Sequence, residues 1–367
     1  ASAEEELLVD IASAEPATLP QQGSARKLNP QEHIERLDTD LVSIVIPAKD
    51  EEGFIGLCLD SILSQDEQHL QVIVVDGGSS DGTSEIVDEY AARDPRVLLL
   101  SGAGQTIPGC LNTGLLASRG RWLIRVDAHS TIPPGYVSTL VEHLRTGAWG
   151  GVGGRKDGVA TSPTGRAIAA ALSSMFGVGK SVYHHGTKTQ VVDHVPYGAY
   201  PTALLQSLGG WDERLLANED FELDYRIRRE GHRLLFDPNV VIAWRSRQKL
   251  GELFRQYQRY GRGKARVAAL HPRSLKPRHM AAPVLVAFWL IAGGLGFLWP
   301  WLFALALIPY AIALLLASVF TARKVVGWAA RRALPGAFLA MHLGWGIGFW
   351  EGAVAVAARR IRKLFSR

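Results

Sequence analysis

Two aspartates each close a short β-branched run that the sequence predicts to be a buried strand. Asp76 follows residues 72–75, and Asp127 ends the run 122–127. Ligands of open α/β sheets bind outside the carboxyl ends of the strands, so both carboxylates are expected to face a binding site. A carboxylate in that place can hold a ribose, a base edge or a metal ion.

The usual phosphate-binding loops are missing from the sequence. The first predicted strand is followed neither by G-x-x-x-x-G-K-[ST] nor by G-x-G-x-x-G. This absence disfavours a P-loop nucleoside triphosphatase and a Rossmann dehydrogenase. The phosphates of a ligand must then be neutralised in another way. Asp127 and His129 offer a carboxylate oxygen and an imidazole nitrogen, a pair that suits Mn²⁺ well and Mg²⁺ less naturally. We therefore expect Mn²⁺ or Mg²⁺ as a cofactor.

These residues lie in a segment, 41–244, that alternates β-branched runs with helical patterns. Such alternation predicts a parallel α/β sheet with helices on both faces. The predicted strands are residues 42–47, 72–76, 96–100, 122–127 and 149–153. Between the first three, residues 52–64 and 81–92 have helical spacing.

The net charge of +5 is very unevenly distributed along the chain. Residues 1–244 carry −13, residues 245–280 carry +10, and residues 281–367 carry +8. The acidic first part disfavours nucleic-acid binding. Within it, residues 1–40 are predicted to be a poorly ordered polar arm without a secretory signal. The two cysteines, Cys58 and Cys110, fit a reducing cytosolic compartment and are predicted to be small core residues.

Residues 281–320 contain no charged residue, and about 20 apolar residues suffice for one membrane-spanning helix. Trp299, Pro300 and Trp301 lie at the midpoint, where a proline can end a helix and tryptophans favour the lipid–water interface. The segment therefore predicts a transmembrane hairpin, with Pro309 kinking its second span. The basic residues on both sides place both flanks in the cytoplasm, and residues 245–280 form a basic juxtamembrane collar.

A third apolar stretch, residues 334–358, precedes the basic tail 359–367. One crossing would carry this tail to the outer side, against the positive-inside rule. We therefore favour a re-entrant or interface-lying segment and keep a simple third span as the alternative. His342 and Glu351 in this stretch are candidate functional groups or partners of neighbouring helices.

The chain resembles glycosyltransferase family 2 over about residues 41–266. The motifs that carry the resemblance occur in the order of that family, at residues 44–51, 74–83, 127–129, 198–200, 209–213 and 218–220. Within the family, the chain resembles most the bacterial succinoglycan-type glucosyltransferases. Three features indicate this: the run 173–179, Asp-Ala-His in place of Asp-x-Asp, and the membrane hairpin. Such a likeness implies a GT-A sheet followed by a helical membrane region.

The resemblance also assigns roles to residues. The nucleotide pocket would be lined by Pro47, Ala48, Asp50 or Glu51, Asp76 and Asp127. Asp127 and His129 would hold the metal, which in the family is bound largely through the nucleotide phosphates. Asp220 is the predicted general base, with Glu219 and Glu222 as rivals. One base suffices because a metal-bound diphosphate leaves without a proton, and it predicts inversion at the anomeric carbon.

An acceptor and diphosphate group of residues is expected mainly in the basic collar. Its members are Glu219, Gln256, Arg259, Tyr260, Arg262 and Lys264. Tyr260 stands where the family's Gln-x-x-Arg-Trp pattern has tryptophan. Arg262 and Lys264 could bind the diphosphate of the donor, bind the diphosphate of an acceptor lipid, or contact anionic lipid headgroups. Arg155 and Lys156 lie in a segment that resembles the acceptor loop of the family, and for each of them a solvated loop is the favoured interpretation.

The expected activity is transfer of a hexose, from UDP-glucose, to a sugar on polyprenyl diphosphate. The enzyme would be a multi-pass protein of the inner membrane with a cytoplasmic catalytic domain, serving the synthesis of exopolysaccharide or another surface glycan. Transfer to polyprenyl phosphate is a close alternative, and a nucleotidyltransferase is a more distant one.

Overall fold

The computed structural model describes residues 37–365, apart from the side chain of Pro300. The predicted polar arm lies outside the described residues except for its last four positions, of which residues 38–40 already belong to the first strand. The last two residues of the basic tail also lie outside them.

A mixed sheet forms the centre of the described chain. Its main path is β3-β2-β1-β4-β8-β6-β9-β5, and β7 pairs with β9. The strands are β1 Asp38–Ala48, β2 Leu70–Asp76, β3 Val97–Ser101, β4 Gly120–Arg125, β5 Ser130–Thr131, β6 Trp149–Val159, β7 Gln190–Val192, β8 Ala199–Pro201 and β9 Arg233–Arg245. The five predicted strands are all present. The predicted α/β sheet is confirmed, with one difference: β5, β7 and β8 run antiparallel to their neighbours, so the sheet is mixed and not parallel throughout.

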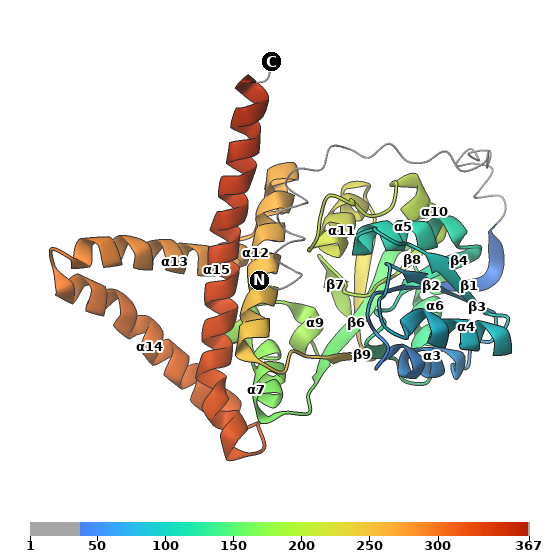
Figure 1. The fold of residues 1–367 in the computed structure, drawn as a ribbon, viewed down its shortest axis with the longest axis horizontal. Helices are drawn as coiled ribbons and strands as arrows, with labels where there is room; N and C mark the ends of the chain where they lie inside the picture. The colour runs from blue at the N-terminus through green and yellow to red at the C-terminus, as the bar shows by residue number, and fades with distance from the viewer. Residues whose placement is uncertain (1–36, 366–367) are drawn as a thin grey trace. The chain divides into compact units, whose positions relative to one another are not determined.

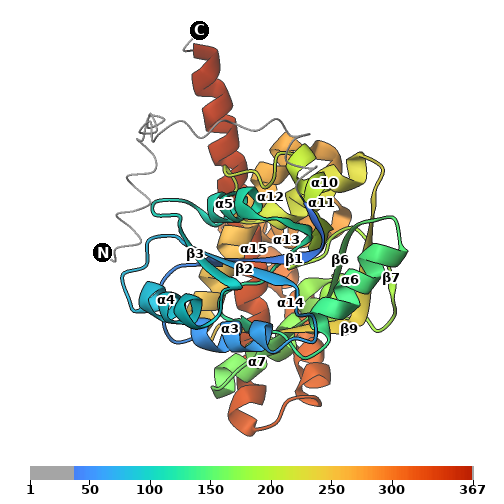
Figure 2. The ribbon, with the colours of Figure 1, turned by 90° about the vertical axis from the view of Figure 1, so that its right-hand side faces the viewer.

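Helices cover both faces of the sheet (Figure 2). The helices of the sheet region are α3 Ile55–Leu63, α4 Thr83–Arg93, α5 Ile107–Ala117, α6 Tyr136–Thr146, α7 Pro163–Leu172, α8 Met175–Val178, α9 Val182–His185, α10 Thr202–Ser207 and α11 Glu219–Arg229. Helices α3, α4 and α6 pack on one face, and α5, α10 and α11 pack on the other.

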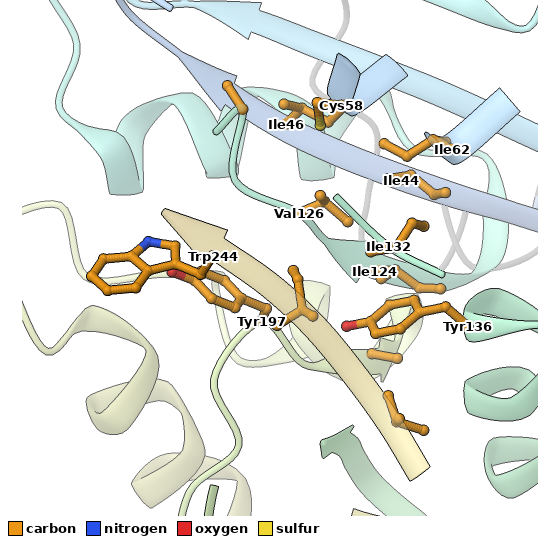
Figure 3. Close-up of a cluster of buried hydrophobic side chains, with 14 of the residues drawn as sticks. Ile44, Ile46, Cys58, Ile62, Ile124, Val126, Ile132, Tyr136, Tyr197 and Trp244 are labelled. Atoms are coloured by element: carbon orange, nitrogen blue, oxygen red, sulfur yellow. The ribbon is translucent and has the colours of Figure 1, made fainter. Parts of the chain in front are cut away.

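The core follows the alternation of side chains along the buried strands. Ile44 and Ile46 of β1 point to the face that also holds Cys58 of α3 (Figure 3). Val45 lies between them in sequence and joins the opposite cluster, together with Cys110 of α5. Adjacent residues of a strand face opposite sides, so a strand buried on both faces is apolar throughout. Both cysteines are buried and unpaired, as predicted.

The basic collar and the apolar segment fold into long helices. After α12 (Leu250–Leu270) and the short η1 (Pro272–Ser274) come α13 Pro277–Gly296, α14 Pro300–Ala322 and α15 Trp328–Phe365. Figure 1 shows α13 and α14 extending away from the sheet, with α15 beside α12. The break between α13 and α14 falls at the predicted Trp299–Pro300 turn. Within the described residues, α13 and most of α14 are the two helices long and apolar enough to cross a membrane.

Residues 334–358 form part of one uninterrupted helix, α15, and the chain does not turn back within them. A re-entrant loop is therefore wrong for this segment. Glu351 accepts hydrogen bonds from Arg262 and Gln258 of α12. His342 contacts the Tyr310 hydroxyl at 2.9 Å and the Phe176 carbonyl at 2.8 Å. The polar groups of this helix are thus partners of neighbouring segments.

Glycines bring α15 into close contact with α12. A Cβ atom added at Gly344 would lie 2.6 Å from the Phe254 carbonyl oxygen, and one at Gly352 would lie 2.8 Å from that of Arg262. Gly348, on the same face between them, lies directly against the Gln258 carbonyl. Small residues spaced by four let two helix backbones approach each other closely.

We expect Gly348→Ala to lower the thermal unfolding temperature by roughly 2–12 °C. Overpacking at such a contact costs about 1–3 kcal/mol, and each kcal/mol shifts the midpoint by about 2–4 °C. Gly251→Ala, in the partner helix α12, is the control because its Cβ would meet open space. That replacement should leave stability unchanged or raise it, since alanine favours helix. Equal effects of the two substitutions would contradict the close packing of α12 and α15.

Candidate active site

The predicted nucleotide residues meet where β1 and β2 end. Parallel pairing places Ala48 beside Asp76. The carboxylate of Asp76 accepts hydrogen bonds from the Ser79 hydroxyl at 2.6 Å and from the Ser84 hydroxyl at 2.7 Å. Burial opposes the ionisation of Asp76, but these hydrogen bonds outweigh it and lower its pKa. Asp76 is therefore a fixed anion at the mouth of the sheet.

The loop after Pro47 and Ala48 is tied to the loop after Asp76. The Asp50 amide donates to the Ser79 hydroxyl at 3.0 Å, and its carboxylate accepts from the Ser80 amide at 2.8 Å. Asp50 has a φ of 53°, in the left-handed region that non-glycine residues seldom adopt. The structure thus gathers these predicted nucleotide residues into one rigid rim.

At the predicted metal end, His129 lies between Glu51 and Trp244. The indole Nε1–H of Trp244 donates to His129 Nε2 at 2.9 Å. An indole can only donate, so the imidazole proton must lie on Nδ1, which donates to Glu51 Oε1 at 2.9 Å. This chain joins the nucleotide rim to the end of β9.

The donor chemistry at this end fits a metal that takes most of its ligands from a diphosphate. Within residues 37–365, no cluster of three or more histidine, cysteine, aspartate or glutamate side chains could hold an ion. Asp127 and His129 would hold it, and the Nε2 lone pair of His129 is available only when Trp244 moves away. Such a pair predicts weak metal binding without nucleotide.

We expect Trp244→Phe to tighten Mn²⁺ binding in the absence of nucleotide by roughly two- to tenfold. The substitution keeps an aromatic ring but removes the hydrogen bond from Trp244 to His129. In the wild type this bond, worth about 0.5–1.5 kcal/mol, must break before His129 can bind the ion. Titration of the full chain with Mn²⁺, followed by electron paramagnetic resonance, measures this change. Trp149→Phe, whose ring stacks on Arg233, is the control. Unchanged affinity in Trp244→Phe would show that Trp244 does not restrain His129.

A buried guanidinium connects the metal end to the predicted base. Arg125, at the end of β4, has only 5% of its side chain exposed. Its Nη1 donates to Asp220 at 2.6 Å and to Glu219 at 3.0 Å, while its Nε donates to Asp127 at 3.1 Å. The Trp211 indole also donates to Asp220, at 2.9 Å. One cation therefore holds three carboxylates in a single cluster.

The pKa values of Asp127 and Glu219 shift in opposite directions, although both carboxylates bind Arg125. Burial opposes the ionisation of Asp127, but the charges of Arg125 and Lys156 and the hydrogen bond of the Tyr197 hydroxyl outweigh it and lower its pKa. Burial dominates at Glu219, where it raises the pKa with help from the neighbouring Asp220 charge. Arg125 stands outside the recognised motifs, although a charged residue at the end of a buried strand is a usable signal.

Helix α11 places Glu219 and Asp220 at its first turn. The preceding Asn218 has a φ of 65° and donates its side-chain amide to the Tyr260 carbonyl at 2.9 Å. Asn218 thereby fixes the start of α11 against the collar helix α12. Glu222, the other rival base, is 2% exposed and binds Arg226 and His271. It is held in a structural network, apart from the carboxylates that Arg125 gathers.

Lys156 belongs to a strand of the sheet, so its predicted loop position is wrong. Strand β6 carries it into the site, where its ammonium donates to the Tyr197 hydroxyl at 2.8 Å. It also lies 3.8 Å from the centre of the Trp244 ring. The adjacent Arg155 pairs with Asp157 at 2.8 Å. Alternation along the strand separates these two basic residues.

The predicted acceptor residues of α12 are dispersed. Gln256 is buried and donates to the Tyr260 hydroxyl at 3.0 Å, close to the start of α11. Arg259 is exposed, and Arg262 pairs with Glu351 of α15 at 2.7 Å. Lys264 is 2% exposed, and its ammonium lies 3.0 Å from the centre of the Phe221 ring. Of these, Gln256 and Tyr260 lie nearest to the carboxylate cluster through Asn218.

The sequence matches two family models. "Glycosyl transferase family 2" covers residues 43–189, and "Glycosyl transferase family group 2" covers residues 122–329. Succinoglycan biosynthesis protein ExoA of Rhizobium meliloti is 33% identical over 322 residues, which is 84% of this chain and 93% of that protein. A Methanococcus voltae enzyme, named as a glucuronosyltransferase acting on a dolichyl N-acetyl-α-D-glucosaminyl phosphate, is 23% identical over 61% of this chain and 73% of its own.

The fold resembles that of the mannosyltransferase PcManGT from Pyrobaculum calidifontis, solved with GDP-Man and Mn²⁺. The TM-score is 0.53 at 20% sequence identity, over 90% of this chain and 92% of that one. This likeness confirms the GT-A type of sheet followed by a helical region. Together with the family models and the extended similarity to ExoA, it shows that the chain belongs to glycosyltransferase family 2.

Proposed function

We propose that the protein is an inverting hexosyltransferase that moves glucose from UDP-glucose to a sugar on polyprenyl diphosphate. The observation that carries this proposal is the Arg125 cluster. It holds Asp220, the predicted base, and Asp127, at the predicted leaving-group end, on one guanidinium. A single displacement needs these two functions on opposite sides of the anomeric carbon.

In this mechanism the chain orients both substrates and accepts one proton. Asp76 and the rim after β1 hold the nucleoside. The acceptor hydroxyl attacks the anomeric carbon, and its proton passes to the Asp220 carboxylate. The bond to the diphosphate oxygen breaks on the other face and leaves its electron pair on the diphosphate. One displacement inverts the configuration.

A divalent ion, Mn²⁺ or Mg²⁺, would neutralise the departing diphosphate. Asp127 and His129 would hold it. Because these two residues offer few donor atoms, the ion is expected to bind as a complex with the nucleotide. The Mn²⁺ in the Pyrobaculum mannosyltransferase structure supports a divalent ion.

We place the acceptor at the cytoplasmic face of the inner membrane. The helices α13 and α14 are long and apolar enough to span it, and the collar before them carries +10 over residues 245–280. Each lysine or arginine near an anionic leaflet contributes about 1 kcal/mol of attraction. The similarity to ExoA, a succinoglycan biosynthesis protein, supports a role in exopolysaccharide synthesis.

A transfer assay with the full chain in detergent or nanodiscs tests the proposal. The donors are radiolabelled UDP-glucose, UDP-galactose and GDP-mannose, and the acceptors are polyprenyl phosphate and a polyprenyl-diphosphate sugar, each with Mn²⁺, Mg²⁺ or chelator. We expect label in the extended lipid-linked sugar, with release of UDP. Transfer to polyprenyl phosphate alone would identify the alternative enzyme, and release of pyrophosphate would identify a nucleotidyltransferase.

A further inference from the structure

Lys156 is a basic group in the site to which the sequence motifs assign no role. Its ammonium lies between the faces of two aromatic rings, 3.8 Å from the centre of Trp244 and 4.7 Å from that of Tyr197. Figure 3 shows both aromatic residues at the edge of the core cluster. Their rings hold the end of this flexible side chain in one place.

The position is built by the fold. Tyr197 is 5% exposed and has a φ of 50°, a conformation that costs a tyrosine of order 1–3 kcal/mol. Its hydroxyl accepts from Lys156 and interacts with the Asp127 carboxylate. One hydroxyl group therefore separates the ammonium from the carboxylate at the leaving-group end.

Within the described residues this ammonium makes no ion pair. Across residues 37–365, no carboxylate oxygen lies within 4.0 Å of the Lys156 nitrogen, whereas the neighbouring Arg155 is paired with Asp157. Burial lowers the pKa of Lys156 to about 8, although Asp127 opposes the shift. A half-buried cation without an ion pair is ready to receive an anionic ligand.

We propose that Lys156 binds the β-phosphate of the donor's diphosphate. The inference rests on the proposed function, in which the donor is a nucleoside diphosphate sugar. As the bond between the anomeric carbon and the β-phosphate oxygen breaks, its electron pair stays on that oxygen, where negative charge develops. An ammonium with three donors stabilises this charge without giving up a proton. Lys156 thereby supplies positive charge next to a weakly held metal.

The experiment compares the binding of nucleoside diphosphates and monophosphates to the full chain by calorimetry. The wild type is first titrated with UDP, GDP and ADP to find the base it prefers. In Lys156→Gln we expect the affinity for that diphosphate to fall roughly ten- to hundredfold, the range of a charged hydrogen bond. Affinity for the matching monophosphate should change less than twofold. Lys156→Arg should recover most of the loss, and Lys188→Gln, an exposed control, should bind like the wild type.

The outcomes separate the inference from the proposed function. Equal losses for the diphosphate and the monophosphate, or no loss for either, would overturn the role of Lys156 while leaving the transferase proposal in place. Loss of farnesyl diphosphate binding with unchanged UDP binding would move Lys156 to the acceptor lipid and also overturn it. A wild type that binds no nucleoside diphosphate would overturn both.

Discussion

Asp220→Asn should lower the rate of sugar transfer about 10²- to 10⁴-fold, the range over which a general base contributes. The side-chain oxygen of asparagine can still accept from Arg125 and Trp211, as the Asp220 Oδ1 does at 2.6 and 2.9 Å. An amide cannot take the proton of the acceptor hydroxyl. Transfer is measured with radiolabelled donor and saturating acceptor, and nucleotide affinity is measured by calorimetry. The affinity should remain within about threefold of the wild type.

Two further variants identify the base. Glu219→Gln should reduce transfer less than Asp220→Asn, because Asp220 is oriented by both Arg125 and Trp211, whereas Arg125 is the one side-chain partner of Glu219 among residues 37–365. Asp94→Asn, which breaks an ion pair with Arg96 outside the site, controls for the loss of a carboxylate. Normal turnover in Asp220→Asn would remove Asp220 as the base. A larger loss in Glu219→Gln would assign that role to Glu219.

Arg125→Met should both abolish transfer and destabilise the fold. It leaves Asp127, Glu219 and Asp220 without their shared cation in a site where their side chains are 13–15% exposed. Removing one partner of a buried ion pair costs about 3–5 kcal/mol, which corresponds to roughly 6–20 °C in the unfolding temperature. Thermal unfolding of the full chain in detergent measures this loss.

The pH dependence separates electrostatics from lost packing. In the wild type the lowered pKa of Asp127 contributes stability above its unfolded pKa, and this contribution disappears as the pH falls through the folded value. In Arg125→Met the crowded carboxylates should protonate more readily, which relieves their repulsion. The Asp127 contribution is the same at pH 5 and pH 8, because both lie above its unfolded pKa of about 3.8. The protonation of the crowded carboxylates in the variant therefore makes the stability deficit smaller at pH 5 than at pH 8. Arg155→Met, whose ion pair is more than one-third exposed, should show little deficit at either pH. An Arg125→Met deficit that does not change with pH would assign the loss to packing.

Local patterns were sufficient to predict much of the architecture. The apolar runs at residues 42–47 and 72–75 are buried strands because each is apolar on both faces, as a strand covered by helices on two sides must be. The uncharged segment forms two helices that meet at Trp299, since Pro300 favours the first position of a new helix. Pro283 and Pro309, in contrast, lie inside α13 and α14. The short antiparallel strand β8 was not predictable, because three residues carry almost no periodic signal.

The site combines both kinds of information. Asp76, Asp127 and Asp220 are recognisable because each stands in a short motif or at the end of an element. The contacts that hold them are not local: Arg125 and Asp220 are 95 residues apart in the chain, and His129 and Trp244 are 115 apart. No spacing rule connects such pairs, since their distance depends on how β4, β9 and α11 are arranged around the sheet.

The residue pattern was sufficient to recognise an acidic α/β domain, a basic collar and two long apolar helices, with carboxylates at the strand ends. Hydrophobic periodicity and charge are properties of each segment, so they can be evaluated without knowing which segments lie next to it in the fold. The three-dimensional arrangement, in contrast, was needed to show that Arg125 binds three carboxylates, that Trp244 donates to His129 and that Lys156 lies in the site. Those are relations between segments, and they form only when burial brings distant side chains together at the expense of their solvation.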